Sequence, residues 1–535
     1  MEKLNKKDLP SEDYDIIVVG SGLAGLYAAL YASSAFRVGL LTKTTLEESC
    51  SFWAQGGIAA VMDPEDSILF HMEDTLKSGQ GLCDVRAVSV LVNEGPDRVK
   101  DLIELGMKFD MEESGLLELG LEGGHSRRRV LHAGGSATGR LMVEFLIEAV
   151  TSNPNITVLE NTSIIELLSD GESCYGALAI DESTNEHLIF TARSTILAMG
   201  GAASLYSRTT NPPSATGDGI AIAFNAGAEV RDMEFMQFHP TALYIEGGES
   251  FLITEAVRGE GAYLLNAAGH RFMPDYDKRG ELATRDVVSR AIYDELGKAN
   301  AKCVYLDLRH LDAEFIKRRF ANIVLKCSDY GIDITRDLIP VAPAAHYTIG
   351  GVRSGLSAET NIQGLFVCGE VASTGIHGAN RLANNSLLEC IVFAKRAVDG
   401  AKRTSVSTND PHRLISTDIT PGEFYPEGDK EAFLAVKLNL SKLMDEKAGI
   451  VRSASGLSKA IAEIERVSMS CTKLRGYFKH KIKNIIEASS LICRSALLRT
   501  ETRGAHIREE YPEQYPRWKA HIVLHKGREP YIEKC

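Results

Sequence analysis

The feature that most constrains the fold is a glycine-rich turn between a predicted strand and a predicted helix, within residues 15–42. The apolar run "DIIVV" is followed by "GSGLAG", the helical stretch "LYAALYASSA" and a second apolar run, "RVGLLT". Here Gly20 permits the tight turn, Gly22 lets backbone N–H groups approach a pyrophosphate, and Gly25 lets the helix pack closely on the strand. The helix N-terminus also favours an anion. The pattern therefore predicts a βαβ unit that binds a dinucleotide.

Two further strands that close on glycine indicate which dinucleotide is bound. "STILAMGG" covers residues 194–201 and "TNIQGLFVCGE" covers residues 360–370. NAD would need only the first unit. Three such elements, far apart in the sequence, suit a long flavin dinucleotide threaded through one domain, with Glu370 holding a ribityl or ribose hydroxyl. We therefore expect FAD.

The length of the chain predicts more than one domain, because 535 residues are too many for one compact core. We expect an α/β fold with a Rossmann-like FAD-binding domain over residues 1–232 and 348–405. An inserted α+β domain would cover residues 233–347. After residue 405 apolar residues recur at three- and four-residue spacing, as in "LSKAIAEIERV". This spacing predicts a helical C-terminal domain over residues 406–535.

Composition and charge exclude several classes of protein. No apolar run approaches the ~18 residues that a membrane span needs, and the charged N-terminal residues lack the apolar core of a secretion signal. The cytoplasm is therefore the expected location. The ten cysteines form no C-x-x-C pair, so neither a zinc site nor a disulfide framework is indicated. A net charge of −13 disfavours nucleic acid as a partner.

The C-terminal segment departs from this acidic balance. Residues 471–535 hold 14 Lys and Arg against 7 Asp and Glu, a net charge of +7. The simpler interpretation is a solvated surface or a segment that packs on the acidic body of the protein. The alternative is a docking surface for a partner.

Nine blocks, in order along nearly the whole chain, resemble the succinate dehydrogenase and fumarate reductase flavoproteins and, within them, the L-aspartate oxidases. They are "GSGLAGLYAAL", "CSFWAQGGIAAV", "EGGHSRRRVLHAGGSATGR", "TNPPSATGDGIAIAFNAGA", "EFMQFHPTAL", "LITEAVRGEGAYL", "RGELATRDVVSRAI", "PAAHYTIGGV" and "GEVASTGIHGANRLANNSLLEC". The resemblance implies an FAD domain, a mobile capping domain in the place of the insertion, and a helical C-terminal domain. It also implies two-electron exchange between the flavin and a four-carbon dicarboxylate.

The resemblance assigns roles to residues within these blocks. The two substrate carboxylates would be held by His239, Thr254, His346 and Arg381, with Arg381 pairing a carboxylate through its planar guanidinium. Taken alone, each histidine on its apolar stretch would more often be a core residue. The implied FAD contacts, beside the glycines of the first turn, are Ser21, Leu23, Ala24, Lys43, Cys50, Ser51, Phe52, Trp53, Ala54, Gln55, Gly56, Gly57, Asp218, Glu370, Ser386 and Leu387. Gly56 and Gly57 would let the backbone approach the isoalloxazine ring.

The stretch "GELATRDVVSRAI", residues 280–292, begins an amphipathic helix with a charged pair, Arg285 and Asp286. By resemblance Arg285 transfers a proton at the substrate. Since a guanidinium does not readily lose a proton, we expect a chain of proton-exchanging groups, and Glu255 and Arg258 in "TEAVRGEG" supply an acid and a base one helical turn apart. The alternative is an ion-pair cluster that only stabilises the capping domain. Asp286 is interpreted as an orienting or helix N-terminal charge.

Two positions distinguish the oxidation of aspartate from that of succinate. Glu122, in "EGGHSRRR", would pair the cationic amino group of aspartate, a bond that succinate cannot form; the alternative is a surface loop residue between glycines. Cys50 falls where the respiratory members carry the histidine that attaches FAD, so we expect non-covalent FAD. Thr42 and Lys43 stand where dinucleotide folds usually place an acidic residue for the ribose, which disfavours NAD and lets Lys43 approach the nucleotide.

These expectations combine into an FAD-dependent oxidation of L-aspartate to iminoaspartate, with oxygen or fumarate as electron acceptor, as the first step of quinolinate and NAD biosynthesis. Transfer of the product to quinolinate synthase, with the basic C-terminal segment as the docking surface, is a further hypothesis. Monomer and homodimer stay open. Two alternatives are a fumarate reductase or succinate dehydrogenase flavoprotein subunit and a non-catalytic flavin-binding module that signals by redox state.

Overall fold

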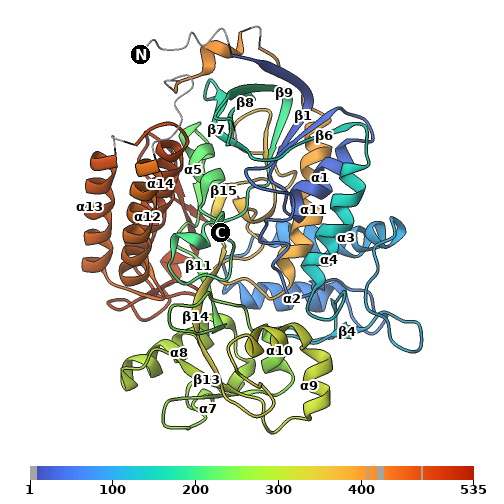
Figure 1. Cartoon of the computed structure of the whole chain (residues 1–535), viewed down its shortest axis with the longest axis vertical. Coiled ribbons are helices and arrows are strands. Elements are labelled where there is room, and N and C mark those ends of the chain that lie inside the picture. Colours follow the sequence, from blue (N-terminus) through green and yellow to red (C-terminus); the bar gives the residue numbers. More distant parts are fainter. Residues whose placement is uncertain (1–8, 183, 405, 409, 418–426, 472–473) are drawn as a thin grey trace.

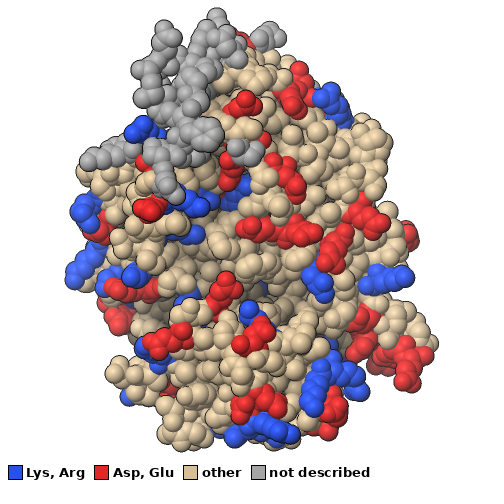
Figure 2. All heavy atoms as spheres, viewed as in Figure 1, with Lys and Arg blue, Asp and Glu red and all other residues tan. Residues whose placement is uncertain are grey.

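The computed structural model describes residues 9–182, 184–404, 406–408, 410–417, 427–471 and 474–535 (Figure 1). Most of the charged N-terminal stretch, residues 1–8, lies outside this range, as does residue 405, the predicted end of the FAD-binding domain. Within the described residues, no helix is both long and apolar enough to cross a membrane. Figure 2 shows acidic and basic side chains interspersed over one face of the molecule.

The predicted βαβ unit opens the central sheet. Strand β1 (Ser11–Val19) runs parallel to β2 (Val38–Leu41), and helix α1 (Leu23–Ala32) connects them. Most of α1 is buried because it packs against α4 (Thr138–Thr151) and α11 (Asn385–Ala401) as well as the sheet. A helix that is apolar on nearly all sides is a core helix, which agrees with the run "LYAALYA".

The three glycine-ended strands lie side by side in this sheet. Strand β9 (His187–Leu197) lies parallel to both β1 and β16 (Leu365–Val367), and the register places Val19, Leu197 and Val367 at one edge. The turns that follow these strands therefore share the carboxyl edge, where open α/β sheets bind ligands. The sheet continues through β6 (Ile156–Leu159), β7 (Thr162–Ser169) and β8 (Cys174–Asp181).

The inserted segment forms the lower body in Figure 1. Its sheet has the order β11 (Met236–Leu243), β14 (Ile339–Thr348), β13 (Val304–Asp307) and β12 (Tyr263–Leu265). Helix α8 (Arg285–Ala299) packs on β11 and buries Val288 and Ala291. The predicted apolar stripe of this helix thus faces the core of the inserted segment, while Val287 is partly buried. The other helices of the segment are α6 (Glu255–Gly259), α7 (Met273–Tyr276), α9 (Ala313–Arg319) and α10 (Ala321–Ser328).

The predicted helical region contains α12 (Glu427–Ala448), α13 (Ala454–Ser470) and α14 (Gly476–Leu498), at the left of Figure 1. These helices pack on one another, and α14 also packs on α5 (Asp218–Asn225). The residues after α14 leave the helices. They form β19 (Ile507–Arg508), β20 (Ala520–Leu524) and β21 (Tyr531–Lys534). The fully buried run of β20 explains why this segment pairs as a strand.

The strands at the end of the chain pair with strands of the FAD-binding part in a small sheet. Its order is β17 (Ala372–Ser373), β15 (Gly351–Arg353), β10 (Val230–Arg231), β20 and β21. Another small sheet contains β3 (Ile58–Ala59), β5 (Val130–Leu131) and β4 (Leu119–Gly120), beside α2 (Ile68–Ser78) and α3 (Val85–Glu104). The loop between β4 and β5 carries Glu122 towards the centre of the molecule.

Candidate active site

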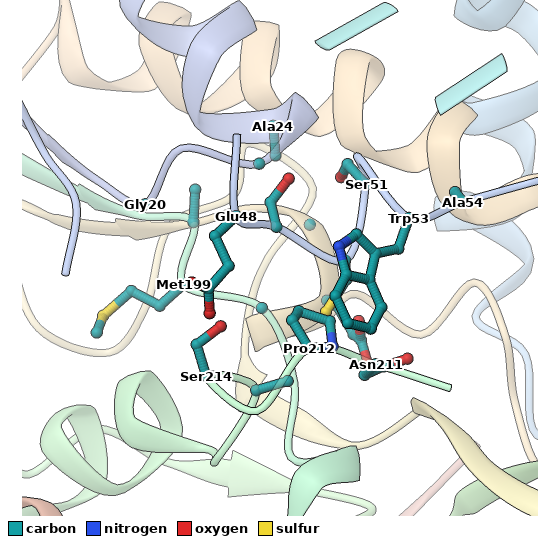
Figure 3. A pocket seen from close by; sticks show the side chains of 18 of the residues that line it. Gly20, Ala24, Glu48, Ser51, Trp53, Ala54, Met199, Asn211, Pro212 and Ser214 are labelled. Atoms are coloured by element: carbon teal, nitrogen blue, oxygen red, sulfur yellow. The ribbon is translucent and has the colours of Figure 1, made fainter. Parts of the chain in front are cut away.

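One large cavity extends from the turn after β1 to the sheet of the inserted segment. Figure 3 shows part of it near α1, with Ala24, Ser51 and Trp53 on one side and Asn211, Pro212 and Ser214 on the other. The cavity gathers most of the residues that the sequence predicts for the site. They are Gly20, Ser21, Gly22, Ala24, Lys43, Cys50, Ser51, Trp53, Ala54, Gln55, Gly56, Gly57, Glu122, Asp218, His239, Thr254, Glu255, Arg285, His346, Glu370, Arg381, Ser386 and Leu387.

The turn between β1 and α1 has the shape that a pyrophosphate needs. Gly20 has φ +113°, and a Cβ at this residue would lie 2.2 Å from the carbonyl oxygen of Ala198. Gly22 is the N-cap of α1 and offers no side chain to the helix N–H groups, although the hydroxyl of Ser51 accepts from Leu23 N at 3.1 Å. A glycine turn in front of an otherwise uncapped helix N-terminus fits the phosphates of FAD.

Three predicted FAD contacts are packing residues, and the structure does not place them on the cavity wall. Leu23 is fully buried in the core around α1, and Phe52 packs against the same core. A Cβ on Gly25 would lie 1.8 Å from Gly20 O, so Gly25 allows the helix to pack on the strand. The side chains of Leu23 and Phe52 therefore do not line the cavity, and Gly25 serves the close packing of helix on strand that the sequence predicts. Their contacts with FAD stay predictions.

Lys43 does not stand free beside the nucleotide site. Its Nζ lies 2.5 Å from Oδ2 of Asp218, which also accepts from the Thr216 hydroxyl at 2.8 Å. Burial would raise the pKa of Asp218, but Lys43 lowers it below its ordinary value. Asp218 is therefore ionised, and its Oδ1 is buried without a partner. This second oxygen is an acceptor that suits a hydroxyl-bearing ligand.

Glu370 lies at the carboxyl edge of the sheet, and its side chain fits there because its neighbour Gly201 has no side chain. Its Oε1 accepts from Thr348 N at 2.9 Å, and a Cβ on Gly201 would lie 2.2 Å from the same oxygen. Burial raises the pKa of Glu370 to about 7. The carboxyl group can therefore donate or accept a hydrogen bond near neutral pH, as binding of a ribose or ribityl hydroxyl requires.

The segment at residues 50–57 forms one wall of the cavity. Burial raises the pKa of the Cys50 thiol well above its ordinary value, and Glu370 raises it further. The thiol is therefore a poor nucleophile for a covalent flavin link. Gln55 keeps a buried Oε1 without a partner. A Cβ on Gly57 would lie 2.2 Å from Leu131 O, so Gly57 is required by packing on β5 beside any approach to the ring.

The substrate end of the cavity is built around Arg285, the first residue of α8. Its Nε donates to Oε2 of Glu255 at 2.8 Å, and its Nη1 donates to Oε1 of Gln237 at 3.2 Å. Glu255 in turn lies 3.3 Å from Nη2 of Arg258, one turn along α6. The predicted order Arg285, Glu255, Arg258 therefore exists as a contiguous buried chain. Arg258 lies behind Glu255 and does not line the cavity.

The carboxyl group of Glu255 keeps its charge in spite of burial. Burial would raise the pKa of Glu255, but Arg285 and Arg258 lower it below the ordinary range. Burial lowers the pKa of Arg258, and Glu255 opposes that shift. The neighbouring residue Asp286 points elsewhere and accepts from Nε2 of Gln80 at 2.7 Å. This contact agrees with an orienting role for Asp286.

Two predicted histidines face each other in the cavity. The rings of His239 and His346 have centroids 5.2 Å apart in an edge-to-face arrangement. Burial lowers the pKa of both well below the ordinary value, and Arg285 lowers both further, so both rings are neutral. Thr241 N donates to Nδ1 of His239 at 3.3 Å. The proton of His239 is therefore on Nε2, which makes the ring a neutral donor.

Arg381 completes the cationic side of the cavity. Its Nη1 donates to Oγ of Ser386 at 2.7 Å, and its guanidinium lies 4.2 Å above the ring of Tyr347. Its Nε is buried without a partner. Burial, and then Arg285, lower its pKa to about 10, so it stays charged at neutral pH. An immobilised guanidinium with a free donor is suited to bind a carboxylate.

Glu122 is buried in the cavity and is no surface loop residue. Its side chain has 3% of its surface exposed, and its Oε1 lies 3.7 Å from Nε2 of His132. Burial raises the pKa of Glu122 to about 7, Glu255 raises it further, and Arg285 opposes the shift. Oε1 has no hydrogen-bond partner. A buried carboxyl oxygen without a partner calls for a donor from a ligand.

The sequence comparisons identify a family. The chain matches the family described as "FAD binding domain" over residues 15–387 and the family described as "Fumarate reductase flavoprotein C-term" over residues 437–534. It is 42% identical to the L-aspartate oxidase of Synechocystis, with 96% of this chain and 97% of the relative covered. The chloroplastic L-aspartate oxidase 2-a of Nicotiana tabacum is 44% identical, with 95% and 83% covered. The chain belongs to the L-aspartate oxidase family.

Solved structures agree with this L-aspartate oxidase fold. Quinol fumarate reductase FrdA of E. coli superposes with a TM-score of 0.89 at 29% identity, covering 98% of this chain and 97% of that chain. Sdh1 of Mycobacterium smegmatis gives 0.82 at 30% identity, covering 98% and 95%. The resemblance to the succinate dehydrogenase and fumarate reductase flavoproteins is thereby confirmed, and so is the FAD-binding fold.

Sequence reasoning missed several residues of this L-aspartate oxidase site. Tyr477, His480, Lys481 and Asn484 of α14 line the cavity near Lys43 and Asp218. Their spacing places them on one helical face, and this polar stripe was the signal available in the sequence. Gln237, two residues before His239, also escaped notice. Its Nε2 donates to Asn380 Oδ1 and Arg381 O, each at 3.0 Å, which turns its Oε1 towards Arg285.

Proposed function

We propose that the protein oxidises L-aspartate to iminoaspartate. The single observation that carries this proposal is the buried carboxyl group of Glu122, which lies in one cavity with Arg285, Arg381 and His239. A dicarboxylate alone would be better served by cations and neutral donors. An ionised carboxylate in this cavity favours a ligand that also carries a positive charge, as an amino dicarboxylate does.

The substrate carboxylates have suitable partners in the cavity. Arg381 offers an unpartnered Nε, His239 offers Nε2–H, and Thr254 adds a hydroxyl on the wall. Because both histidines are neutral, they donate hydrogen bonds without adding charge. The formal charges of Arg285 and Arg381 then match the two carboxylates of aspartate.

Glu122 would bind the substrate amino group. A hydrogen bond to a charged group typically contributes about 1.5–3 kcal/mol. The substrate cation would also favour the ionised form of Glu122, whose pKa burial raises to about 7 in the free protein. Succinate and fumarate would leave Oε1 of Glu122 without a donor, at the cost of an unsatisfied buried polar atom.

FAD, when bound, supplies the two-electron acceptor for the hydride that leaves the substrate. The protein's own contribution is position and proton handling. Oxidation of aspartate to the imine removes a hydride from the α-carbon and a proton from nitrogen. Arg285, held by Glu255 and Gln237, would exchange a proton at the substrate, and Glu255 with Arg258 would extend the path away from it.

The wider role follows from the same chemistry. Oxygen or fumarate would be the electron acceptor, and iminoaspartate would enter quinolinate and NAD biosynthesis. We place the reaction in the cytoplasm and propose quinolinate synthase as a partner, because a labile imine benefits from direct transfer. The protein would act as a monomer or a homodimer.

The test compares aspartate and succinate as electron donors for the purified, FAD-loaded chain. We expect kcat/KM for aspartate to exceed that for succinate, with oxaloacetate and ammonia appearing as the imine hydrolyses. Equal or higher kcat/KM for succinate would favour the second candidate, a succinate dehydrogenase or fumarate reductase subunit, which the solved relatives support.

A further inference from the structure

A second cluster of reactive side chains lies at the end of the chain, outside the cavity described above. The Sγ atom of Cys535 is 3.3 Å from Nε2 of His521. The other ring nitrogen of His521, Nδ1, is 2.6 Å from Oδ2 of Asp232. A thiol, an imidazole and a carboxylate thus stand in series, which is the arrangement that activates a nucleophilic cysteine.

The small sheet builds this arrangement from distant parts of the sequence. His521 lies on β20, and Asp232 follows β10, which pairs antiparallel with β20. Asp232 has φ +60°, an uncommon conformation for a residue other than glycine. Its N–H donates to Ile522 O at 3.0 Å, and Cys535 N donates to Lys519 O at 3.4 Å. Backbone hydrogen bonds therefore hold the segments that carry all three side chains.

The charges around His521 keep its ring protonated. Burial would lower the pKa of His521, but Asp232 raises it to about 10, against the opposing charge of Arg231. Asp232 also faces Arg231 at 3.8 Å and Arg499 at 3.9 Å, and its own pKa lies below the ordinary range because His521 and these cations outweigh burial. Both ring nitrogens of His521 are thus donors at neutral pH, and Nε2–H is directed at the sulfur.

The sulfur is open to small molecules. Cys535 is exposed, and it lines a cavity together with His521, Arg231 and Lys519. Cys83 lines the same cavity but is buried, and burial raises the pKa of its thiol to about 12. The cavity therefore contains the Cys535 thiol beside the His521 imidazolium, and the Cys83 thiol, which is protonated and inert. Cys83 is an internal comparison for the reactivity of Cys535.

We propose that Cys535 is a peroxide-reactive thiol that His521 and Asp232 activate. Its thiolate attacks one oxygen of a hydroperoxide, so an S–O bond forms and the O–O bond breaks. The leaving oxygen takes the Nε2 proton of His521. Sulfur is oxidised by two electrons to a sulfenic acid, and hydrogen peroxide is reduced to water. Hydrogen peroxide is the two-electron reduction product of oxygen, so the proposed oxidation of aspartate in air would supply this reagent.

The test treats the FAD-loaded, full-length protein with added hydrogen peroxide and traps sulfenic acid with dimedone. Peptide mass spectrometry should find Cys535 trapped before Cys83, Cys303 or Cys471. His521→Asn should slow trapping at least about tenfold, because the variant removes the group that protonates the leaving oxygen. His525→Asn, four residues along the same segment, is the matched control and should leave the rate unchanged.

Two outcomes would overturn the proposal: Cys535 trapped no faster than Cys303, or trapped equally fast in His521→Asn. If His521→Asn fails to fold, judged by its flavin spectrum, alkylation of the unaltered protein by iodoacetamide replaces it. Cys535 should be alkylated faster than Cys303 and Cys471, and alkylation no faster than that of Cys303 would contradict the proposal. Because peroxide is added, the result does not depend on aspartate turnover, which Cys535→Ser should retain.

Discussion

The guanidinium of Arg285 is held in one orientation by two partners of different kinds. Glu255 accepts from its Nε and Gln237 accepts from its Nη1. Gln237 is itself fixed, because its Nε2 donates to Asn380 and Arg381. A planar fork can use both partners and still present a donor to the substrate. The ammonium group of a lysine is a compact point charge and lacks this planar geometry.

Arg285→Lys should therefore lower kcat by at least about 100-fold, the usual contribution of a positioned proton-transfer group. The flavin absorbance should be retained, since Arg285 lies at the substrate end of the cavity. The matched control is Arg290→Lys, an exposed residue of the same helix, which should behave as the unaltered protein. Near-normal turnover of Arg285→Lys would indicate that Arg285 is only an ion-pair partner of Glu255 and does not transfer a proton.

Glu122→Gln tests the recognition of the amino group. Loss of a charge-assisted bond of about 1.5–3 kcal/mol should raise KM for aspartate roughly 10- to 150-fold, while KM for fumarate as acceptor changes little. Glu118→Gln, an exposed residue just before β4, is the control. Steady-state kinetics with aspartate and with fumarate measure the two KM values. A similar loss for aspartate and fumarate would remove Glu122 from specificity.

The pH dependence of aspartate binding follows from the same residue. Burial raises the pKa of Glu122 to about 7, so the free protein holds this carboxyl group largely protonated at pH 6 and largely ionised at pH 8. Only the ionised form pairs with an ammonium group. KM for aspartate should fall about tenfold from pH 6 to pH 8, and Glu122→Gln should remove this dependence. A KM that rises with pH would contradict the account.

Helices and strands that a local sequence pattern specifies were predicted. The pairing of strands that lie far apart in the sequence was not. The βαβ unit and α8 were predicted because apolar spacing, glycines and charges within about 30 residues specify them. The sheet that joins β10, β15 and β20 was not, because short strands give little periodic signal and their pairing depends on tertiary packing. For the same reason α14 was predicted as a helix, but its place on the FAD-binding cavity was not.

The turn between β1 and α1 makes a sharp prediction. Gly20→Ala would put a Cβ 2.2 Å from Ala198 O at a residue with φ +113°, so the turn must open and its phosphate-binding N–H groups must move. The variant should bind FAD at least about tenfold more weakly and melt at a lower temperature. Gly297→Ala is the control, because its Cβ would meet nothing within 4 Å. FAD titration and thermal denaturation measure both effects, and unchanged FAD affinity would argue against a phosphate site here.

At the scale of the whole molecule, the site exists only where three parts of the chain meet. The carboxyl edge of the central sheet supplies Gly20 and Glu370, the inserted segment supplies Arg285 and His239, and α14 closes the far end of the cavity. Sequence blocks gave the residue types correctly because each block is local. They could not place the side chains of Leu23 and Phe52, which pack in or against the core.

We propose that Glu122 and Arg285 bind the same amino dicarboxylate beside FAD. The most direct measurement mixes the FAD-loaded protein with L-aspartate in the absence of oxygen and follows the flavin absorbance band. We expect aspartate to bleach the flavin band rapidly and succinate to bleach it much more slowly. The Glu122→Gln variant should lose this preference for aspartate. Bleaching by succinate that equals or exceeds bleaching by aspartate would contradict this proposal.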